Sequence, residues 1–452
     1  MRYFLAIIGG GPAGYTAAEK ASKAGRDVVL FEQNAVGGTC LNVGCIPTKS
    51  LLYGAKQFYN ATHAQKYGVT AENVKFDFAA MQKRKTIVVR KLVAGIKQRL
   101  NNEHCTLVSG CAKVLSRQPS LISIECNGEV YEAENLLVCT GSTNFVPPIP
   151  GIKDNPHVWD STDALAATEL PKSVVIVGGG VIGMEFATLY HELGVPVTVI
   201  EAMPTILPNL DQEVVSVLLD KYRKAGVTIL TGTKVEEIDG QRIKANGEWL
   251  EADKILVSVG RRANLQGLEA LEGLELNRGT IVVDDSMKTS LPNVFAAGDV
   301  TGKIMLAHVA SRQAEVAVAR LLNDSTNDQM VPDQIVNYLA IPSVVYTNPE
   351  IASVGLTEQQ AADRNIQTEV HKLPMTFSGR FMAENEGETG LCKMVVNAKN
   401  QQVLGVHCIG NPCSEFIAAA AFAISNGYTM SQMQQVVFPH PTVSEILHEI
   451  IG

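Results

Sequence analysis

The sequence lacks several features that would assign it to large classes of protein. Among its 452 residues no apolar stretch reaches the roughly 18 residues that a membrane-spanning helix needs. It also lacks an excess of positive charge: the formal net charge is −8 and the pI about 5.7, which argues against nucleic acid as a partner. No charged segment or cleavage site precedes the apolar run at residues 3–8, so no secretory signal is indicated. We therefore expect a cytoplasmic protein without a membrane or nucleic-acid partner.

The most informative stretch contains two cysteines five positions apart. Residues 37–49 read GGTCLNVGCIPTK, so Cys40 and Cys45 lie between a nucleotide-binding pattern and a helix-like run. A disulfide between these two residues would lie beside a bound redox cofactor. It could hold two electrons, because thiolate attack on one sulfur releases the other as a thiolate. The segment therefore indicates disulfide–dithiol chemistry.

The remaining cysteines do not indicate a second site. The total of nine is odd and spread along the chain, unlike a secreted disulfide framework, and neither close pair has the spacing of a zinc site, so we expect no metal. Cys408 and Cys413 repeat the spacing of Cys40 and Cys45, but no nucleotide loop precedes them and no lysine follows one turn later. We interpret that match as coincidence. The other five lie in apolar or strand-like contexts and are expected to be inert buried thiols: Cys105, Cys111, Cys126, Cys139 and Cys392.

The chain also contains an internal repeat. IIGGGPAG at residues 7–14 is echoed by IVGGGVIG at residues 176–183. Each copy leads through a helical stretch to a strand that ends in a glutamate, Glu32 or Glu201, 23 residues after its first glycine. A G-x-G-x-x-G pattern in this context predicts a dinucleotide site, with the pyrophosphate at the helix N-terminus and the acid on the ribose. The chain is therefore predicted to bind two dinucleotides.

The positions of the two repeats indicate which dinucleotide each binds. The first copy leads directly to the cysteine pair, so its nucleotide exchanges electrons with sulfur, which suits FAD. Nicotinamide carries hydride only, so the second copy suits NAD or NADP. Glu201 would repel a 2′-phosphate, and residues 201–210 contain no arginine or lysine to bind one. We therefore expect FAD and NAD as cofactors.

Composition shifts divide the chain into four segments of an α/β protein. A Pro-rich connector near residues 140–151 ends the first nucleotide unit, and residues 257–262 close a strand of the second. We predict two Rossmann-like dinucleotide-binding domains, for FAD and NAD, and a C-terminal α+β dimerisation domain. The predicted segments are 1–145 (FAD-binding, with the redox disulfide), 146–265 (NAD-binding), 266–335 (completing the FAD-binding domain) and 336–452 (dimerisation).

These motifs resemble a known family over the whole chain. The flavin-dependent pyridine nucleotide–disulfide oxidoreductases contain segments like GGTCLNVGCIPTKS, VGRRAN, NVFAAGDV, MLAH at 305–308, the 341–358 segment and HPTVSE at 440–445. The resemblance is strongest to the branch that oxidises dihydrolipoamide. It implies a homodimer with FAD and NAD that takes dihydrolipoamide, on a lipoyl domain of a 2-oxoacid dehydrogenase or glycine cleavage complex.

The resemblance also implies catalytic roles. Cys40 would meet the substrate and Cys45 would lie against the flavin as the charge-transfer thiolate. Lys49, one helical turn after Cys45, would pair with Glu185 near the flavin. His440 would be the base that deprotonates the dithiol and would reach the other subunit's disulfide, with Glu445 orienting it. Thr442–Glu445 also has the pattern of a helix capping box, which leaves a purely structural role for Glu445 open.

The remaining residues of the two sites follow from the same resemblance. Those implied for FAD are Gly9, Gly11, Pro12, Ala13, Gly14, Glu32, Gly38, Thr39, Lys49, Ala112, Thr140, Gly141, Ser142, Asp299, Met305, Leu306, Ala307 and His308. Those implied for NAD are Gly178, Gly180, Val181, Ile182, Gly183, Glu185, Glu201, Val235 and Gly260.

Other functions of the same family stay open at this point. Glutathione-type reductases use NADPH, which Glu201 disfavours, and mercuric reductase needs extra thiols that residues 447–452 lack. A reductase of small oxidants, such as reactive chlorine species, remains a further alternative. A flavin-binding sensor without turnover would be expected to lose Cys40, Cys45, Lys49, His440 or Glu445, and all five are present.

Overall fold

The computed structural model describes residues 2–323 and 335–452. The chain forms two compact units, one of Met1–Ser50, Ala80–Phe145 and Gly260–Val336, the other of Leu51–Ala79, Val146–Val259 and Asn337–Gly452. The predicted fold class is confirmed: parallel sheets with covering helices are followed by an α+β domain. The exact limits of the four predicted segments stay a prediction.

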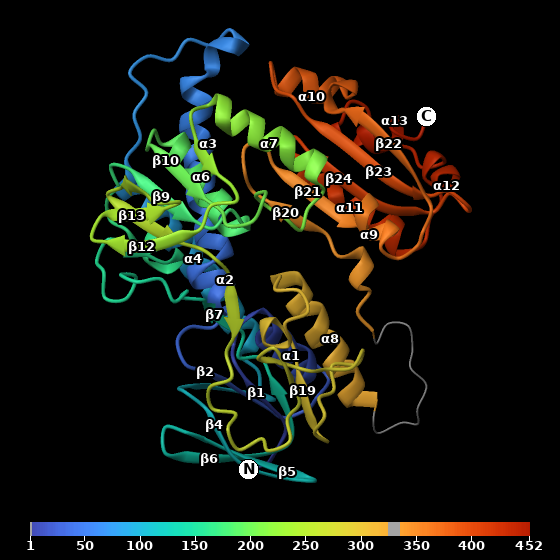
Figure 1. Ribbon diagram of the computed structural model, residues 1–452. Helices are drawn as coiled ribbons and strands as arrows, with labels where there is room; N and C mark the ends of the chain where they lie inside the picture. The colour runs from blue at the N-terminus through green and yellow to red at the C-terminus, as the bar shows by residue number, and fades with distance from the viewer. Residues whose placement is uncertain (1, 324–334) are drawn as a thin grey trace. The chain divides into compact units, whose positions relative to one another are not determined.

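The first unit is built on a mostly parallel sheet in the order β3-β2-β1-β6-β5-β4, with β19 beside β6. β1 is nearly all buried apolar residues, as expected of a parallel strand that is covered on both faces. Helix α1 has an alanine-rich buried face and packs closely against α8 (Figure 1). The bounds are β1 Arg2–Ile8, α1 Pro12–Lys23, β2 Val28–Glu32, β3 Cys105–Ser109, β4 Lys113–Gln118, β5 Leu121–Cys126, β6 Glu129–Val138, β19 Val294–Ala296 and α8 Ala307–Asn323.

The second unit contains a parallel sheet that repeats part of the first. Its order is β11-β10-β9-β15-β8, so β9 and β10 occupy the places that β1 and β2 have in the other sheet. The repeat in the sequence is thus a repeat in the fold. The bounds are β8 Val158–Trp159, α5 Ser161–Ala166, β9 Val174–Val177, α6 Val181–Glu192, β10 Val197–Ile200, α7 Gln212–Lys224, β11 Thr228–Leu230, β12 Val235–Asp239, β13 Arg242–Ala245, β14 Glu248–Glu251 and β15 Lys254–Val257.

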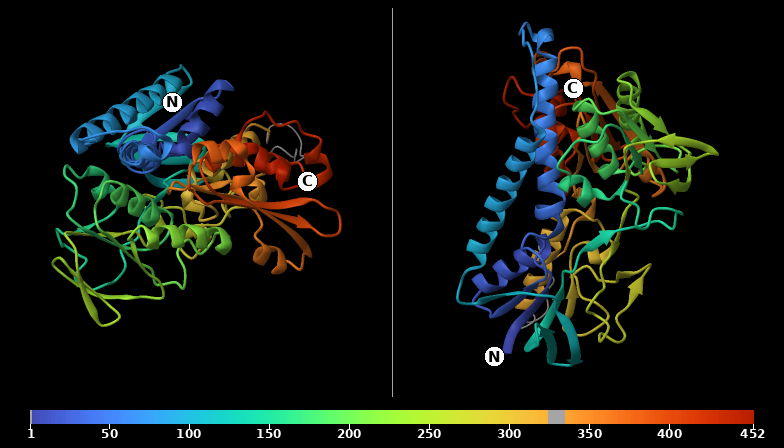
Figure 2. Two further views of the ribbon diagram at one scale, coloured as in Figure 1. Left: turned by 90° about the horizontal axis from the view of Figure 1, so that it is seen from above. Right: turned by 90° about the vertical axis from the view of Figure 1, so that its left-hand side faces the viewer.

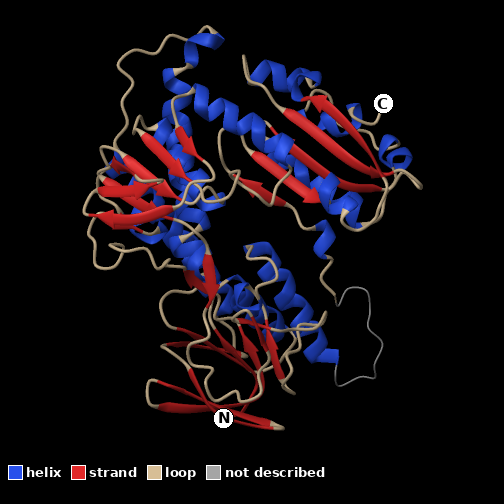
Figure 3. Ribbon diagram, viewed as in Figure 1, coloured by secondary structure: helices blue, strands red, loops and turns tan. Residues whose placement is uncertain are grey.

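The same unit contains an antiparallel sheet in the order β20-β21-β24-β23-β22, drawn in red in the upper right of Figure 3. Helix α11 packs on β21 and β24, and α7 also contacts β24 and β23. Alternate residues of the strands form an apolar core with α11, which includes Met394, Val406 and Phe416. The bounds are β20 Ser343–Val345, β21 Ile351–Gly355, β22 Thr368–Pro374, β23 Leu391–Asn397, β24 Val403–Ile409 and α11 Cys413–Ser425.

Two long helices follow the cysteine segment. α3 (Cys45–Thr62) and α4 (Phe78–Leu100) can be followed as blue ribbons in Figure 2. Within the first unit, Arg84 Nη1 of α4 donates to the carbonyl oxygen of Ser50 in α3 at 3.3 Å. None of the helices among the described residues is both long and apolar enough to span a membrane. The remaining elements are α2 Gly38–Val43, β7 Ser142–Asn144, β16 Arg261–Ala263, β17 Leu276–Asn277, β18 Thr280–Ile281, α9 Glu358–Ala362, α10 Gly379–Glu384, α12 Met430–Gln434 and α13 Ile446–Glu449.

Candidate active site and nucleotide-binding loops

The first glycine loop joins β1 to α1 and has no room for side chains. Gly9 has a φ of 105°, and a Cβ atom at Gly14 would lie 1.8 Å from the carbonyl oxygen of Gly9. Gly11 caps α1 without a side-chain hydrogen bond, so the first N–H groups of the helix face the loop. These groups suit a pyrophosphate, and the loop therefore fits a dinucleotide such as FAD.

The second loop, between β9 and α6, reproduces this geometry. Gly178 has a φ of 108°, and a Cβ atom at Gly183 would lie 1.9 Å from the carbonyl oxygen of Gly178. Gly180 caps α6 without a side-chain hydrogen bond, and Val181, the first residue of α6, is exposed. The second loop therefore fits a dinucleotide in the same way.

The two glutamates hold the two loops with matching hydrogen bonds. Glu32 accepts from the backbone nitrogens of Gly10 at 2.7 Å and Asn34 at 2.8 Å. Glu201 accepts from the backbone nitrogens of Gly179 at 2.6 Å and Met203 at 2.7 Å. A carboxylate oxygen can accept more than one hydrogen bond, so ribose hydroxyls remain possible partners. The sequence indicated the ribose contact but not this support of each loop.

The two cysteines lie on different helices. Cys40 is in α2, Cys45 is the first residue of α3, and both are half-buried thiols in this structure. A hydrogen bond between the two sulfur-bearing side chains, followed by burial, raises the pKa of Cys40. The two side chains are therefore neighbours, and the proton stays on Cys40 more firmly than on an ordinary thiol. Lys49 follows Cys45 by four residues in α3 and hence lies on the same face.

Two residues near the cysteines were not predicted from the sequence. Tyr15 of α1 has a raised pKa, caused first by burial and next by the charge of Cys40. Asn42 lies between the cysteines, and its side-chain nitrogen donates to the carbonyl oxygens of Val36 at 3.2 Å and Gly38 at 3.0 Å. Asn42 thereby fixes α2 to the preceding loop.

A second polar group surrounds Asp299 in the same unit. Ser142 donates from its hydroxyl to Asp299 at 2.5 Å and accepts from Arg261 Nε at 2.7 Å. Gln313 of α8 is fully buried and accepts from the backbone nitrogen of Gly298 at 2.7 Å. The sequence indicated Asp299 and Ser142 but not Arg261 or Gln313 as their support. A buried glutamine on an otherwise apolar helix face was the available signal.

The other predicted FAD residues occur in the same unit. Gly38 approaches Gly11 so closely that a Cβ atom on it would lie 2.6 Å from the Cα of Gly11. Thr140 donates from its hydroxyl to the carbonyl oxygen of Asn264 at 2.6 Å. The remaining positions are Pro12 and Ala13 at the start of α1, Thr39 in α2, Ala112 before β4, Gly141 before β7, Met305 and Leu306 before α8, and Ala307 and His308 in its first turn.

The predicted NAD residues lie in the second unit, except Gly260. Ile182 and Gly183 are in the first turn of α6, Val235 begins β12, and Gly260 follows β15 at the boundary of the first unit. Glu185 is buried in α6 and accepts from the backbone nitrogen of Tyr346 at 3.2 Å. Glu185 and Lys49 belong to different units, so their pairing stays a prediction.

His440 and Glu445 form a direct contact in the second unit. His440 Nδ1 lies 2.9 Å from Glu445 Oε1, and the imidazole is 80% exposed. Glu445 Oε2 also accepts from the backbone nitrogen of Thr442 at 2.7 Å, which completes a capping box. This backbone bond, and then the bond to His440, lower the pKa of Glu445. Glu445 thus caps the helix with Oε2 and holds the imidazole of His440 with Oε1.

In the second cysteine pair, the Cys413 thiol donates to the backbone carbonyl oxygen of Cys408 at 3.9 Å and not to its sulfur. Cys408 is the next-to-last residue of β24 and Cys413 begins α11, and the sulfur of Cys392 on β23 lies 3.3 Å from that of Cys408. All three thiols are buried. The prediction of buried thiols is wrong for Cys111, which is exposed, because it lies in the turn before β4, and Cys105 is only half-buried.

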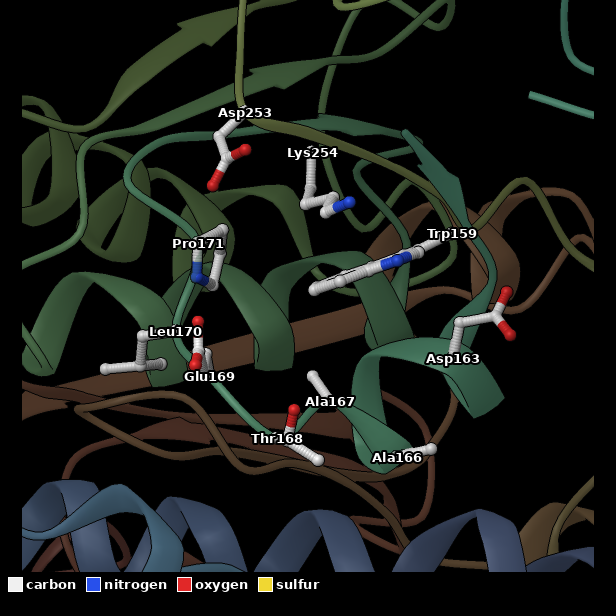
Figure 4. Close-up of a pocket in the computed structure, with 10 residues that line it drawn as sticks. All are labelled: Trp159, Asp163, Ala166, Ala167, Thr168, Glu169, Leu170, Pro171, Asp253 and Lys254. Atoms are coloured by element: carbon white, nitrogen blue, oxygen red, sulfur yellow. The ribbon is translucent and has the colours of Figure 1, made fainter. Parts of the chain in front are cut away.

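The second unit contains a pocket of about 470 Å³. Figure 4 shows the residues that line it. Trp159 and Lys254 lie on one side of it, with the ammonium 5.0 Å from the ring centre. Asp253 and Lys254 precede or begin β15, whereas the glycine loop follows the carboxyl end of β9, so this pocket is separate from the loop. Among the described residues, no three histidine, cysteine or acidic side chains are arranged to hold a metal ion.

Two family models match the chain. One, described as pyridine nucleotide-disulphide oxidoreductase, matches residues 3–314, and the other, the dimerisation domain of that family, matches residues 341–451. The chain belongs to the pyridine nucleotide–disulphide oxidoreductase family. It is an FAD-dependent oxidoreductase that uses NAD(H), and the two loops described above fit these cofactors. It also carries the family's dimerisation domain.

Individual relatives are similar over the full chain. Dihydrolipoyl dehydrogenase of Thermus scotoductus is 39% identical over 99% of this chain and 96% of its own length, and that of Chlamydia pneumoniae is 36% identical over 98% and 95%. Among solved structures, LpdA of Mycobacterium tuberculosis is 25% identical with a TM-score of 0.90 and covers 100% of this chain and 99% of that one. The HOCl-induced flavoprotein disulfide reductase RclA of Escherichia coli is 30% identical with a TM-score of 0.86 and the same coverage.

Proposed function

We propose that the chain is a dihydrolipoyl dehydrogenase, which oxidises dihydrolipoamide to lipoamide and reduces NAD+. The observation that carries this proposal is the hydrogen-bonded Cys40–Cys45 pair, with Cys40 in α2 and Cys45 at the start of α3, in the same unit as the FAD-type loop. Full-length similarity to dihydrolipoyl dehydrogenases supports the choice of substrate.

In this proposal the reaction starts from the Cys40–Cys45 disulfide. His440 takes a proton from one thiol of the substrate, and the resulting thiolate attacks Cys40, so that a mixed disulfide forms and Cys45 leaves as a thiolate. The second substrate thiol then displaces Cys40. The substrate leaves as a cyclic disulfide, and the two cysteines hold the two electrons. Glu445 positions the imidazole and stabilises it once it is protonated, as its 2.9 Å contact allows.

The electrons of the reduced pair leave from the sulfur of Cys45. FAD, when bound, supplies two-electron transfer between this sulfur and NAD+. Lys49 lies on the same face of α3 as Cys45. Its positive charge stabilises the Cys45 thiolate and the reacting end of the cofactor. Glu185 is proposed as the partner that holds Lys49 in place.

The cofactor-binding roles are proposals of the same kind. The two glycine loops bind the pyrophosphates of FAD and NAD, Glu32 and Glu201 bind the riboses, and Asp299 binds a flavin hydroxyl. Glu201 also favours NAD over NADP, because its charge repels a 2′-phosphate. Residues 1–145 and 266–335 then form the FAD-binding domain, 146–265 the NAD-binding domain, and 336–452 the dimerisation domain.

The assembly is proposed to be a homodimer in the cytoplasm. The dimerisation-domain match supports the dimer. The resemblance to the family implies that the base and the disulfide of one active site come from different subunits. The partner subunit's His440 would then complete each active site. The substrate is proposed to arrive on a lipoyl domain of a 2-oxoacid dehydrogenase or glycine cleavage complex.

A second candidate is a disulfide reductase that acts against small oxidants. The specific observation in its favour is the full-length similarity to RclA, an HOCl-induced reductase, at 30% identity. Its identity is lower than the 36–39% found with the dihydrolipoyl dehydrogenases, which is why we rank it second.

One comparison of substrates separates dihydrolipoamide oxidation with NAD+ from reduction of a disulfide by NADPH. The purified FAD-loaded protein is mixed with dihydrolipoamide and NAD+, and separately with NADPH and glutathione disulfide. We expect NADH production in the first mixture and at least a hundredfold lower rate in the second. A higher rate with NADPH and glutathione disulfide would reject the dihydrolipoyl dehydrogenase function.

A further inference from the structure

Helix α6 carries a buried polar stripe, which we define as Glu185, Thr188 and Glu192. The three residues are spaced by three and four positions, so they lie on one face of the helix. Their exposed fractions are 3%, 2% and 7%. Buried polar groups on a helix need partners, because burying them unpaired is unfavourable.

Each of the three residues has a partner that belongs to, or leads to, one short segment of the C-terminal part, Tyr346–Asn348. Glu185 accepts from the backbone nitrogen of Tyr346 at 3.2 Å, and Glu192 accepts from Asn348 Nδ2 at 2.6 Å. Thr188 lies 2.5 Å from the hydroxyl of Tyr222, which accepts from the backbone nitrogen of Asn348 at 3.4 Å. The stripe is therefore bound at three points to one stretch of three residues.

The segment is fixed on its other side as well. Asn411 Nδ2 donates to Asn348 Oδ1 at 3.0 Å, so the amide of Asn348 is bound at both of its ends. The amide orientation is thereby determined, with its nitrogen toward Glu192. The position of Tyr346–Asn348 is therefore coupled to that of α6 through the bonds to Glu185 and Glu192.

Glu192 is an unfavourable residue to bury unless it has a task. Burial raises its pKa to about 7, and the hydrogen bond from Asn348 acts in the opposite direction. An apolar side chain of similar size would fill the same space without this cost. The hydrogen bond from Asn348, followed by the charges of Lys56 and Lys221, favours the carboxylate form that packing alone does not require.

We propose that Tyr346–Asn348, acting through Glu192, Thr188 and Tyr222, positions the carboxylate of Glu185. This inference rests on the proposed function, in which Glu185 holds Lys49 beside Cys45. Glu192 is a positioning residue, since its contact is to Asn348. Without it, α6 shifts relative to the segment, Lys49 is held less firmly, and the anionic reduced pair loses stabilisation.

The test measures the dithiol-to-disulfide ratio of Cys40 and Cys45 in the FAD-loaded protein. The protein is equilibrated without oxygen in buffers of reduced and oxidised dithiothreitol, quenched with an alkylating reagent, and the two cysteines are quantified by mass spectrometry. Glu192→Leu is expected to shift the ratio roughly tenfold toward the disulfide, equivalent to about 30 mV. Glu192→Gln, which keeps an oxygen for Asn348, is expected to stay within about twofold of the native protein.

Asn348→Ala removes the same bond from a half-buried position and keeps the test valid if Glu192→Leu does not fold. The matched control is Glu213→Gln. Glu213 of α7 bonds Lys393 of β23 at 3.1 Å, so it joins the same two parts without touching α6. An unchanged ratio in Glu192→Leu and Asn348→Ala, or an equal shift in Glu192→Gln or the control, would overturn the proposal. Because the buffer is dithiothreitol, this result is independent of whether dihydrolipoamide is the substrate.

Discussion

Two pairs of cysteines in this chain have the same spacing and different surroundings. Cys40 lies in the short helix α2 and Cys45 begins α3, in the same unit as a nucleotide loop, and their thiols are joined by a hydrogen bond. Cys408 and Cys413 end a strand and begin a helix in the core of the C-terminal sheet, and the nearest sulfur to Cys408 belongs to Cys392. Spacing alone thus does not make a redox pair. The first pair differs from the second in its nucleotide loop, in the exposure of its thiols and in the nearby charge of Lys49, and we attribute its redox role to these features.

The largest difference between the pairs is expected in turnover. Cys40→Ser or Cys45→Ser is expected to abolish dihydrolipoamide oxidation, a loss of more than about a thousandfold, because the disulfide can no longer form. Cys413→Ser is expected to keep activity within about threefold. Steady-state rates with dihydrolipoamide and NAD+ measure both. Equal losses in the two pairs would mean that the second pair takes part in the reaction.

Removal of the base should have the next largest effect, and only at the first pair. His440→Gln is expected to lower the rate of disulfide reduction by dihydrolipoamide by about a hundredfold to ten-thousandfold, since proton transfer contributes that much. Rapid mixing of the FAD-loaded protein with dihydrolipoamide gives this rate. His448→Gln, a histidine of α13, is the control and should react like the native protein. A matching loss in that control would point to a folding defect.

Alkylation should distinguish the pairs by accessibility and by pH. The hydrogen bond to Cys45 raises the pKa of Cys40, so in the reduced protein its thiolate fraction and alkylation rate should rise about tenfold per pH unit between pH 7 and 9. Cys408 and Cys413 are buried and have raised pKa values through contact with Cys392 and through burial, so they should stay unmodified. Peptide mass spectrometry after iodoacetamide treatment follows each site. A rate at Cys40 that does not change with pH would contradict the hydrogen bond.

The smallest effect is expected on stability, and there the second pair matters more. Cys408→Ala removes a fully buried sulfur from the core and should lower the free energy of unfolding by about 1–2 kcal/mol. Cys40→Ala, at a half-buried site, should cost less than about 1 kcal/mol. Denaturant unfolding of the FAD-loaded variants measures the difference. The reverse order would mean that the first pair stabilises the fold.

Much of the site could be predicted from the sequence because its signals are local. The two glycine loops, their glutamates and the Cys40–Cys45 segment each lie within one stretch of chain, and periodicity and turn chemistry determine such stretches. Contacts between distant stretches could not be predicted. Gln313 at Gly298 and Cys392 beside Cys408 depend on helix packing and strand register, which no short pattern contains. Cys111 was misplaced for a similar reason, since apolar neighbours do not show which way a turn faces.

The central claim is that Cys40 and Cys45 carry electrons from dihydrolipoamide to NAD+. Anaerobic titration of the FAD-loaded protein with dihydrolipoamide, followed by absorbance, tests it most directly. The account predicts a long-wavelength absorption band on reduction, its loss on addition of NAD+ with formation of NADH, and its absence in Cys45→Ser. A reduced native protein without that band, or one that reoxidises only with NADP+, would contradict it.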